Sequence, residues 1–163
     1  MSSATARVAA AMLRTRWLVR TPIWVFRARL GAIFGGRLLM LEHKGRRTSR
    51  RRYVTLEVVD HPGPDTYVVV SGFGERSQWF RNVTADPNVR VWIGSHAPAP
   101  ATAIRLDAAE AASTLTMYAQ AHPSAWANLR PVLEQTLGHP ADVDSTDLPV
   151  IALELSTRSG GRP

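Results

Sequence analysis

The apolar and polar positions after residue 36 follow a pattern that predicts strands and short turns. Runs rich in Val, Leu, Ile and Tyr occur at residues 37–44, 53–60, 66–72, 89–94, 101–107 and 148–156. Short runs of this composition are typical of β-strands. Turn-forming stretches separate them, among them HPGPD at residues 61–65 and SHAPAP at residues 95–100. We therefore expect six strands.

Helical spacing fills most of the remaining chain. It covers residues 3–19, residues 22–34, a short stretch from Ser77 to the Asp86-Pro87 pair, and residues 108–137. Pro22 suits the first turn of the second helix, and Gly35 ends its apolar stripe. Trp79 is expected on the buried face of the short helix. The long helical pattern is interrupted near His122.

The order of these elements predicts an α+β fold. Strands with short connections, one helix inserted mid-sheet and a return strand after the last helices favour a mainly antiparallel sheet or small barrel. The regular alternation of a doubly wound sheet is missing. A chain of 163 residues fits one domain. We expect a basic helical extension at residues 1–36, a barrel at residues 37–156 and a flexible tail at residues 157–163.

Basic residues are concentrated in the first third of the chain. Residues 1–52 hold 13 of the 20 lysines and arginines and one acid, Glu42, which gives a net charge of +12. Residues 53–163 hold seven bases and 12 acids, which gives −5. Nearly every base is arginine, the better residue for bidentate contacts to phosphate and carboxylate. This asymmetry indicates nucleic acid, an anionic membrane surface or an anionic ligand as the partner.

Several classes of chemistry lack support in the sequence. There is no cysteine, which excludes disulfides and thiol nucleophiles and fits a reducing cytoplasm. The five histidines are scattered and are interpreted as surface or capping residues, so no metal site is predicted. No zinc-protease, serine-hydrolase or calcium-loop motif occurs. Aromatic residues do not alternate with the arginines, so nucleic-acid binding is not expected.

The N-terminal segment bears on localisation. Its longest apolar run, residues 22–26, is far shorter than the ~20 residues that span a membrane. Arginines interrupt any signal-peptide core, so we expect a cytoplasmic protein. Residues 22–34 combine aromatic residues with arginines. This composition suits a membrane interface, at the inner face, and equally a helix packed on the barrel.

The stretch HKGRRTSRRR, residues 43–52, carries the strongest candidate chemistry. One lysine and five arginines lie within nine residues and lead directly into an apolar strand that holds them in place. Such a turn can give a carboxylate or phosphate several charge-assisted hydrogen bonds, and a solvated hairpin loop is the alternative. A second, weaker candidate is SGFGERSQW at residues 71–79, where a strand passes through glycines into the amide end of a helix.

The combined motif from Gly45 to Gly94 resembles the deazaflavin-dependent nitroreductase family, the actinobacterial oxidoreductases that use coenzyme F420 within a split β-barrel. The family pattern is a GRxxGxxR turn, two strands, and then S-x-G followed by W-x-x-N-L-x-A-x-P-x-V. The matching residues are Gly45, Arg46, Arg47, Thr48, Arg52, Ser71, Gly72, Trp79, Asn82, Ala85, Pro87 and Val89. The resemblance covers about residues 20–155. Ser49 replaces the second turn glycine, and Arg51 replaces the proline before the last arginine.

The resemblance implies a cofactor and the residues that hold it. Coenzyme F420 carries an anionic phosphodiester and an oligoglutamate tail, which the family binds at its basic turn. The expected cofactor-binding residues are Lys44, Arg46, Arg47, Thr48, Arg52, Thr55, Ser71, Gly72, Ser77, Gln78, Trp79 and Asn82. A deazaflavin transfers hydride and carries the hard chemistry itself, so no catalytic residue is expected. FMN and haem, found on other split barrels, are less favoured.

The resemblance also implies an acceptor. Family substrates are small or lipophilic molecules such as quinones, and Tyr118 and Trp126 are expected at the substrate pocket. The tyrosine cluster of the nitro-reducing members has no match here, so nitroimidazole reduction is not expected. A non-catalytic protein that holds a fatty acid or another lipid at the membrane is the alternative. Split-barrel flavin enzymes are often dimers, so a homodimer is expected by analogy.

Overall fold

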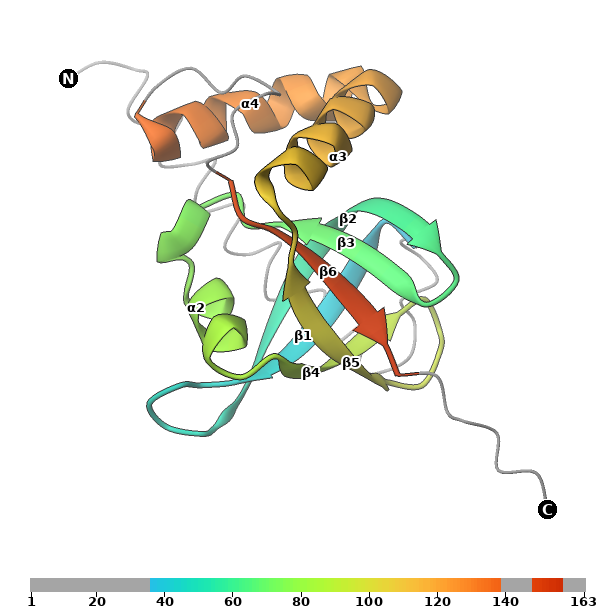
Figure 1. Ribbon diagram of the computed structural model, residues 1–163, viewed down its shortest axis with the longest axis vertical. Helices are drawn as coiled ribbons and strands as arrows, with labels where there is room; N and C mark the ends of the chain where they lie inside the picture. Colours follow the sequence, from blue (N-terminus) through green and yellow to red (C-terminus); the bar gives the residue numbers. More distant parts are fainter. Residues whose placement is uncertain (1–35, 139–147, 157–163) are drawn as a thin grey trace.

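A closed six-stranded barrel forms the centre of the molecule (Figure 1). The computed structural model describes residues 36–138 and 148–156. The strands are β1 (Leu38–Lys44), β2 (Arg51–Gly63), β3 (Thr66–Val70), β4 (Asn88–Ile93), β5 (Ala99–Arg105) and β6 (Val150–Leu155). They follow the order β1-β2-β3-β6-β5-β4, and every neighbouring pair is antiparallel. The predicted α+β fold with a split-barrel sheet is confirmed.

Helices connect two pairs of strands. The short 3-10 helix η2 (Gly74–Arg76) and α2 (Gln78–Ala85) join β3 to β4, while α3 (Ala108–Ala121) and α4 (Pro123–Leu137) lie between β5 and β6 in sequence. Figure 1 shows α3 and α4 together above the barrel and α2 at its side. The turn between β1 and β2 projects below α2, past the end of the barrel. This arrangement brings the basic turn and α2 to the same side.

Two apolar clusters stabilise these elements. Inside the barrel, alternate residues of the strands meet the buried face of α2; this cluster includes Leu39, Leu41, Leu56, Val69, Trp79, Phe80, Val83, Val91 and Leu153. The second cluster joins α3 to the outer face of the sheet, with Leu115 and Tyr118 packed near Val68 and Val150. A capping box between Asp107 and Glu110 fixes the start of α3.

Strand boundaries differ from the predicted ones at two places. β2 continues to Gly63, through the first half of the predicted HPGPD turn, because its pairing with β3 shifts register twice after Val58. Such bulges let a strand bend and continue. β5 begins at Ala99, inside the predicted SHAPAP loop. Pro100 has no N–H to donate and is tolerated because it lies at the beginning of the strand; its carbonyl accepts from Ser156 N at 2.9 Å.

Some predictions fall on other parts of the chain. The helix at residues 3–19, the segment at residues 22–34 and the tail at residues 157–163 lie outside the described residues. Among the helices of the described ranges, none has the length and apolar character to cross a membrane.

Candidate active site

The basic turn between β1 and β2 is tightly hydrogen-bonded. The Gly45 carbonyl accepts from Thr48 N at 3.2 Å and from Ser49 N at 2.7 Å, and Gly45 N donates to Arg50 O at 2.9 Å. Ser49 has a φ of 53°, the left-handed conformation that usually requires glycine. Ser49, which stands where the resemblance of the sequence expects a glycine, thus has a backbone conformation that glycine adopts easily.

Gly45 allows two side chains to approach the turn. A Cβ atom at this position would lie 2.8 Å from Thr48 Oγ1 and 2.9 Å from Arg52 Nε. Both distances are far below ordinary van der Waals contact. Glycine here lets the Arg52 guanidinium lie against the main chain of the turn.

Arg46 joins the turn to α2. Its main-chain N and its Nη1 both donate to Asn82 Oδ1, each at 3.1 Å, and Nη1 also donates to Gln78 Oε1 at 3.0 Å. Gln78 and Asn82 lie one turn apart on α2, so one guanidinium spans both. Asn82 is buried, and its Nδ2 lies 3.2 Å from Nδ1 of His43. These contacts fix the turn relative to the helix.

His43 corrects the interpretation of all five histidines as surface or capping residues. The ring is only 4% exposed, because it points from β1 towards the barrel interior, beside α2. Burial, and then the positive charge of Arg52, lower the pKa of His43 from 6.5 to about 4, although the main chain of Lys44 acts in the opposite direction. His43 is therefore neutral at physiological pH. The only sequence signal for this burial was the position of His43 in β1, two residues after the apolar Leu41 on the same face.

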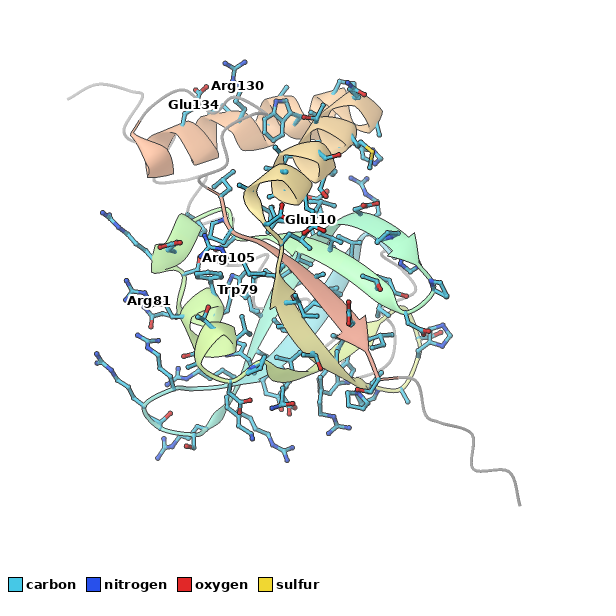
Figure 2. The ribbon with its side chains drawn as sticks, in the orientation of Figure 1. Trp79, Arg81, Arg105, Glu110, Arg130 and Glu134 are labelled. Atoms are coloured by element: carbon cyan, nitrogen blue, oxygen red, sulfur yellow. The ribbon has the colours of Figure 1, made fainter. Side chains whose placement is uncertain are left out.

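The cations of the turn divide between the two faces of the hairpin. Lys44 pairs with Asp86 at 3.4 Å and Arg51 with Glu42 at 3.8 Å. Within the residues that the structure describes, no carboxylate pairs with the other four arginines; Arg46 bonds Gln78 and Asn82, and Arg47, Arg50 and Arg52 have no acidic partner. Figure 2 shows side chains that end in nitrogen gathered around this turn. Without an acidic partner in the described ranges, the guanidinium groups of Arg47, Arg50 and Arg52 can bind an anion.

A cleft of about 490 Å³ opens between the hairpin and the β3–α2 connection. Its lining residues are His43, Arg52, Tyr53, Val54, Phe73, Arg76, Ser77, Gln78 and Trp79. The Tyr53 ring packs edge-on against Trp92 on the outer face. The other lining residues combine two arginines with the aromatic side chains of Phe73 and Trp79 and include no acidic residue. An anion with a flat aromatic part matches both features.

Phe73 and Arg76 are cleft residues that the sequence-based site did not include. Phe73 is 53% exposed although it is large and apolar, and it lies between two glycines at the cleft. The sequence signal for Phe73 was an aromatic residue between two glycines, because glycines have no side chains that could shield its ring from solvent. Arg76 adds a second cation to the lining.

Ser71 has a supporting position. It is fully buried, its hydroxyl donates to Gly74 O at 2.7 Å, and it lies 2.8 Å from the Ser77 hydroxyl. These bonds hold the connection in which Gly74 has a φ of 64°. Ser71 thus braces the turn that places Ser77 and Gln78 at the cleft. Gly72 lies in the same connection.

Of the predicted site residues, Arg52, Ser77, Gln78 and Trp79 line the cleft. Lys44, Arg46, Arg47, Thr48, Ser71, Gly72 and Asn82 belong to the turn, the β3–α2 connection and α2 beside it. Thr55, Tyr118 and Trp126 lie elsewhere. Thr55 is on β2, and its Oγ1 is the one buried side-chain oxygen or nitrogen without a hydrogen-bond partner in the described part of the chain. Tyr118 donates to Glu57 Oε1 at 2.7 Å; burial, and then Glu57, raise the pKa of its hydroxyl. Tyr118 lines a second hollow, of about 390 Å³, between β2 and α3, and Trp126 packs on the α3 cluster.

Charged pairs elsewhere do not contribute to this site. Arg130 and Glu134 form an i, i+4 pair at 2.8 Å on α4, and Figure 2 shows both directed away from the barrel. The described residues contain no group of three or more histidines and acids that could hold a metal ion. The cleft between the β1–β2 hairpin and the β3–α2 connection is therefore the candidate active site.

The family model described as F420H(2)-dependent quinone reductase matches residues 18–133, which is most of the chain. The chain belongs to this family. It is an F420-dependent oxidoreductase, and coenzyme F420 is its cofactor. A comparison with curated proteins gave no match.

Solved structures support the fold of this F420H2-dependent quinone reductase family member. A structure of F420-H2 Dependent Reductase (FDR-A) is 24% identical, covers 72% of this chain and 94% of its own, and has a TM-score of 0.52. A structure described as a domain-swapped dimer is 22% identical, covers 86% and 99%, and has a TM-score of 0.53. A protein related to general stress protein 26 (pyridoxinephosphate oxidase family) from Clostridium acetobutylicum is 10% identical, covers 80% and 83%, and has a TM-score of 0.51. At these identities the likeness concerns the fold.

Proposed function

We propose that the cleft beside the basic turn, between the β1–β2 hairpin and the β3–α2 connection, is the F420 site and that the enzyme reduces a quinone. The observation that carries this proposal is the position of Arg52. Its guanidinium has no carboxylate partner in the described residues, and it lines a cleft with Trp79 and Phe73. A phosphodiester needs the cation, and a tricyclic ring needs the flat apolar surface.

The residues of the turn would have different roles. Arg52 and Arg76 would bind anionic groups inside the cleft, while Arg47 and Arg50 offer exposed guanidinium groups at its edge for the glutamate tail. Thr48 and the main-chain amides of the turn add neutral donors. Lys44 and Arg46 already have protein partners, so their main role would be to hold the turn in place.

The α2 side of the cleft would hold the ring. Trp79 is part of the apolar core and also lines the cleft, so its position is fixed. Gln78 accepts from Arg46 through its side-chain oxygen, which leaves its amide nitrogen to donate, and the Ser77 hydroxyl lies beside it. These groups would orient the polar edge of the ring without a charge.

The acceptor follows from the family description and from the apolar part of the lining. When bound, the reduced deazaflavin supplies a hydride, and a quinone that takes this hydride and one proton becomes a quinol. Phe73 and Val54 give a flat, neutral molecule apolar surface. The chain's own residues then need only to bind, orient and exclude water.

A matched pair of arginine variants tests the F420 site. Arg51 and Arg52 are adjacent, but Arg51 pairs with Glu42 on the outer face whereas Arg52 lines the cleft. We expect Arg52→Ala to raise the Kd for F420 about 10- to 100-fold, because a charge-assisted hydrogen bond contributes about 1.5–3 kcal/mol. Arg51→Ala should change it less than threefold. Titration of the coenzyme fluorescence measures both.

Two results would contradict the proposal, each in a different part. If wild-type protein leaves the F420 fluorescence unchanged at micromolar concentrations, the cleft is not the coenzyme site. If F420 binds but the reduced coenzyme is not oxidised on addition of a soluble quinone, the cofactor site stands and the quinone acceptor is wrong. Absorbance of the oxidised coenzyme follows that reaction directly.

Two predictions about assembly remain to be tested. A homodimer is expected by analogy, and light scattering on the purified protein measures its mass. Contact between residues 22–34 and a membrane is expected from their composition, and co-sedimentation with anionic vesicles tests it. Removal of these residues should abolish co-sedimentation if the segment provides the contact.

A further inference from the structure

The proton on His43 can be located from the hydrogen bonds around it. Arg46 has only donors, and it makes two hydrogen bonds to Asn82 Oδ1. The Asn82 amide is therefore oriented with Nδ2 towards His43, and Nδ2 can only donate. His43 Nδ1 must accept, so it carries no proton. A neutral ring then carries its proton on Nε2.

Nε2 is the ring nitrogen that Asn82 does not contact. Among the side chains that the structure describes, Asn82 forms the hydrogen bond with the His43 ring, at Nδ1. His43 lines the cleft, so a ligand in the cleft approaches the imidazole ring. A neutral imidazole N–H beside Arg52 is a donor that a ligand oxygen can use.

We propose that His43 binds the coenzyme, its Nε2–H donating a hydrogen bond to an oxygen of the bound F420. This inference rests on the proposed function, since it places the coenzyme in the same cleft. Arg46 and Asn82 are positioning residues, which fix the ring and its tautomer. The oxygen is either a carbonyl of the ring or an oxygen of the phosphodiester, because His43 lines the cleft together with both Arg52 and Trp79.

The position of His43 makes a donor role more suitable than proton transfer. His43 faces Arg52 across the hairpin, and no acidic side chain lines the cleft. The nearest charges are thus cations, which oppose protonation of the ring. Nε2–H therefore stays a neutral donor over the range in which the enzyme binds its coenzyme.

Binding measurements with two substitutions test this role. We expect His43→Phe, which keeps a ring but no donor, to raise the Kd for F420 about five- to tenfold. His43→Gln, whose amide can donate, should recover part of the loss. His96→Phe, at an exposed histidine in the β4–β5 loop, is the control and should leave the Kd unchanged. If His43→Phe folds and binds F420 as tightly as wild type does, the proposal is wrong.

A shortened ligand identifies which oxygen of the coenzyme accepts the hydrogen bond from His43. The 8-hydroxy-5-deazariboflavin chromophore lacks the phosphodiester and the glutamates. If His43→Phe weakens both ligands equally, the acceptor is on the ring. If it weakens only F420, the acceptor is on the phosphodiester. Both outcomes support the hydrogen bond.

Nitrogen NMR of the wild-type protein gives an independent measurement that needs no variant to fold. With ¹⁵N-labelled histidine, we expect His43 to show a bare Nδ1 and a protonated Nε2 in the free protein. Saturation with F420 should shift the Nε2–H signal and leave that of His96 unchanged. A protonated Nδ1, or an Nε2–H signal that does not respond to bound F420, would overturn the proposal. Failure of F420 to bind at all would instead remove the proposed function.

Discussion

His43 and Arg52 lie directly opposite each other on β1 and β2, and both line the cleft. Successive side chains of a strand point to opposite faces. The side chains of His43 and Arg52 therefore point inwards, whereas those of the next residues, Lys44 and Arg51, project to the outer face and pair with acids. A positive charge therefore lies beside a buried imidazole. This juxtaposition has consequences for stability as well as for binding.

The first prediction concerns stability against pH. The pKa of His43 is lowered to about 4 in the folded protein and is about 6.5 in the unfolded chain. As the pH falls below 6.5, His43 takes up a proton in the unfolded state first. The contribution of His43 to the free energy of unfolding is therefore fully present above pH 6.5 and is lost as the pH falls towards 4. The loss is up to about 3 kcal/mol. Urea unfolding of wild type and His43→Gln from pH 7.5 to 4.5 measures it.

The difference between the two proteins isolates His43 from the other groups that titrate in this range. The His43→Gln variant should lose much less stability over the same range. Equal slopes for the two proteins would show that the His43 pKa is not lowered by folding.

The second prediction concerns salt. Binding of an anion by the unpaired arginines should weaken as ionic strength rises, because exposed charges are screened beyond about 10 Å at 0.1 M salt. We expect Arg47→Ala and Arg52→Ala each to reduce the slope of log Kd for F420 against log salt. Fluorescence titrations between 50 and 500 mM salt measure the slope. An unchanged slope in both variants would mean that neither guanidinium contacts the coenzyme.

The third prediction concerns Gly45. A methyl group there must displace Thr48 Oγ1 or Arg52 Nε, both of which are side-chain atoms that can move. Gly45→Ala should therefore lower the free energy of unfolding by only about 1 kcal/mol, yet raise the Kd for F420 severalfold because Arg52 leaves its position. Gly63→Ala, where a Cβ meets nothing within 4 Å, is the matched control. Equal Kd values for the two variants would contradict the role of Gly45.

Periodicity was sufficient to predict the six strands, the inserted helix and the basic turn, because each depends on local spacing. It could not assign the individual arginines. Arg46 binds Gln78 and Asn82, which lie 32 and 36 residues further along the chain, so its partners depend on where α2 packs. The same holds for His43, whose ring is buried beside Asn82 of α2. Tertiary packing, rather than sequence spacing, selects which cations stay unpaired.

The fourth prediction concerns Ser49. A left-handed φ of 53° is unfavourable for serine by about 1–2 kcal/mol, and glycine relieves this strain but adds entropy to the unfolded chain. The net effect of Ser49→Gly should be a stabilisation of about 0.5–1 kcal/mol, seen as a higher Tm. Ser95→Gly, at an exposed turn residue without a positive φ, should not stabilise. A lower Tm for Ser49→Gly would show that its conformation carries no strain.

The last prediction concerns Tyr118, which the sequence placed at the acceptor site. Its hydroxyl donates to Glu57, and Arg37 also contacts Glu57 at 3.5 Å, so Tyr118→Phe leaves the carboxylate with one partner. Because Glu57 is partly exposed, we expect a loss of only about 1 kcal/mol in the free energy of unfolding. The KM for the quinone should not change, since Tyr118 lines the second hollow and not the cleft with Arg52.

Steady-state kinetics with a soluble quinone separate the two roles of Tyr118. Met117→Ala, at the neighbouring exposed position in the same hollow, removes apolar surface without touching the Glu57 hydrogen bond. If both variants raise the KM with an unchanged Kd for F420, the acceptor reaches this hollow, as the sequence predicted. If Tyr118→Phe alone is less stable and neither variant changes the KM, the hydroxyl serves only to join α3 to β2, and the acceptor does not reach this hollow.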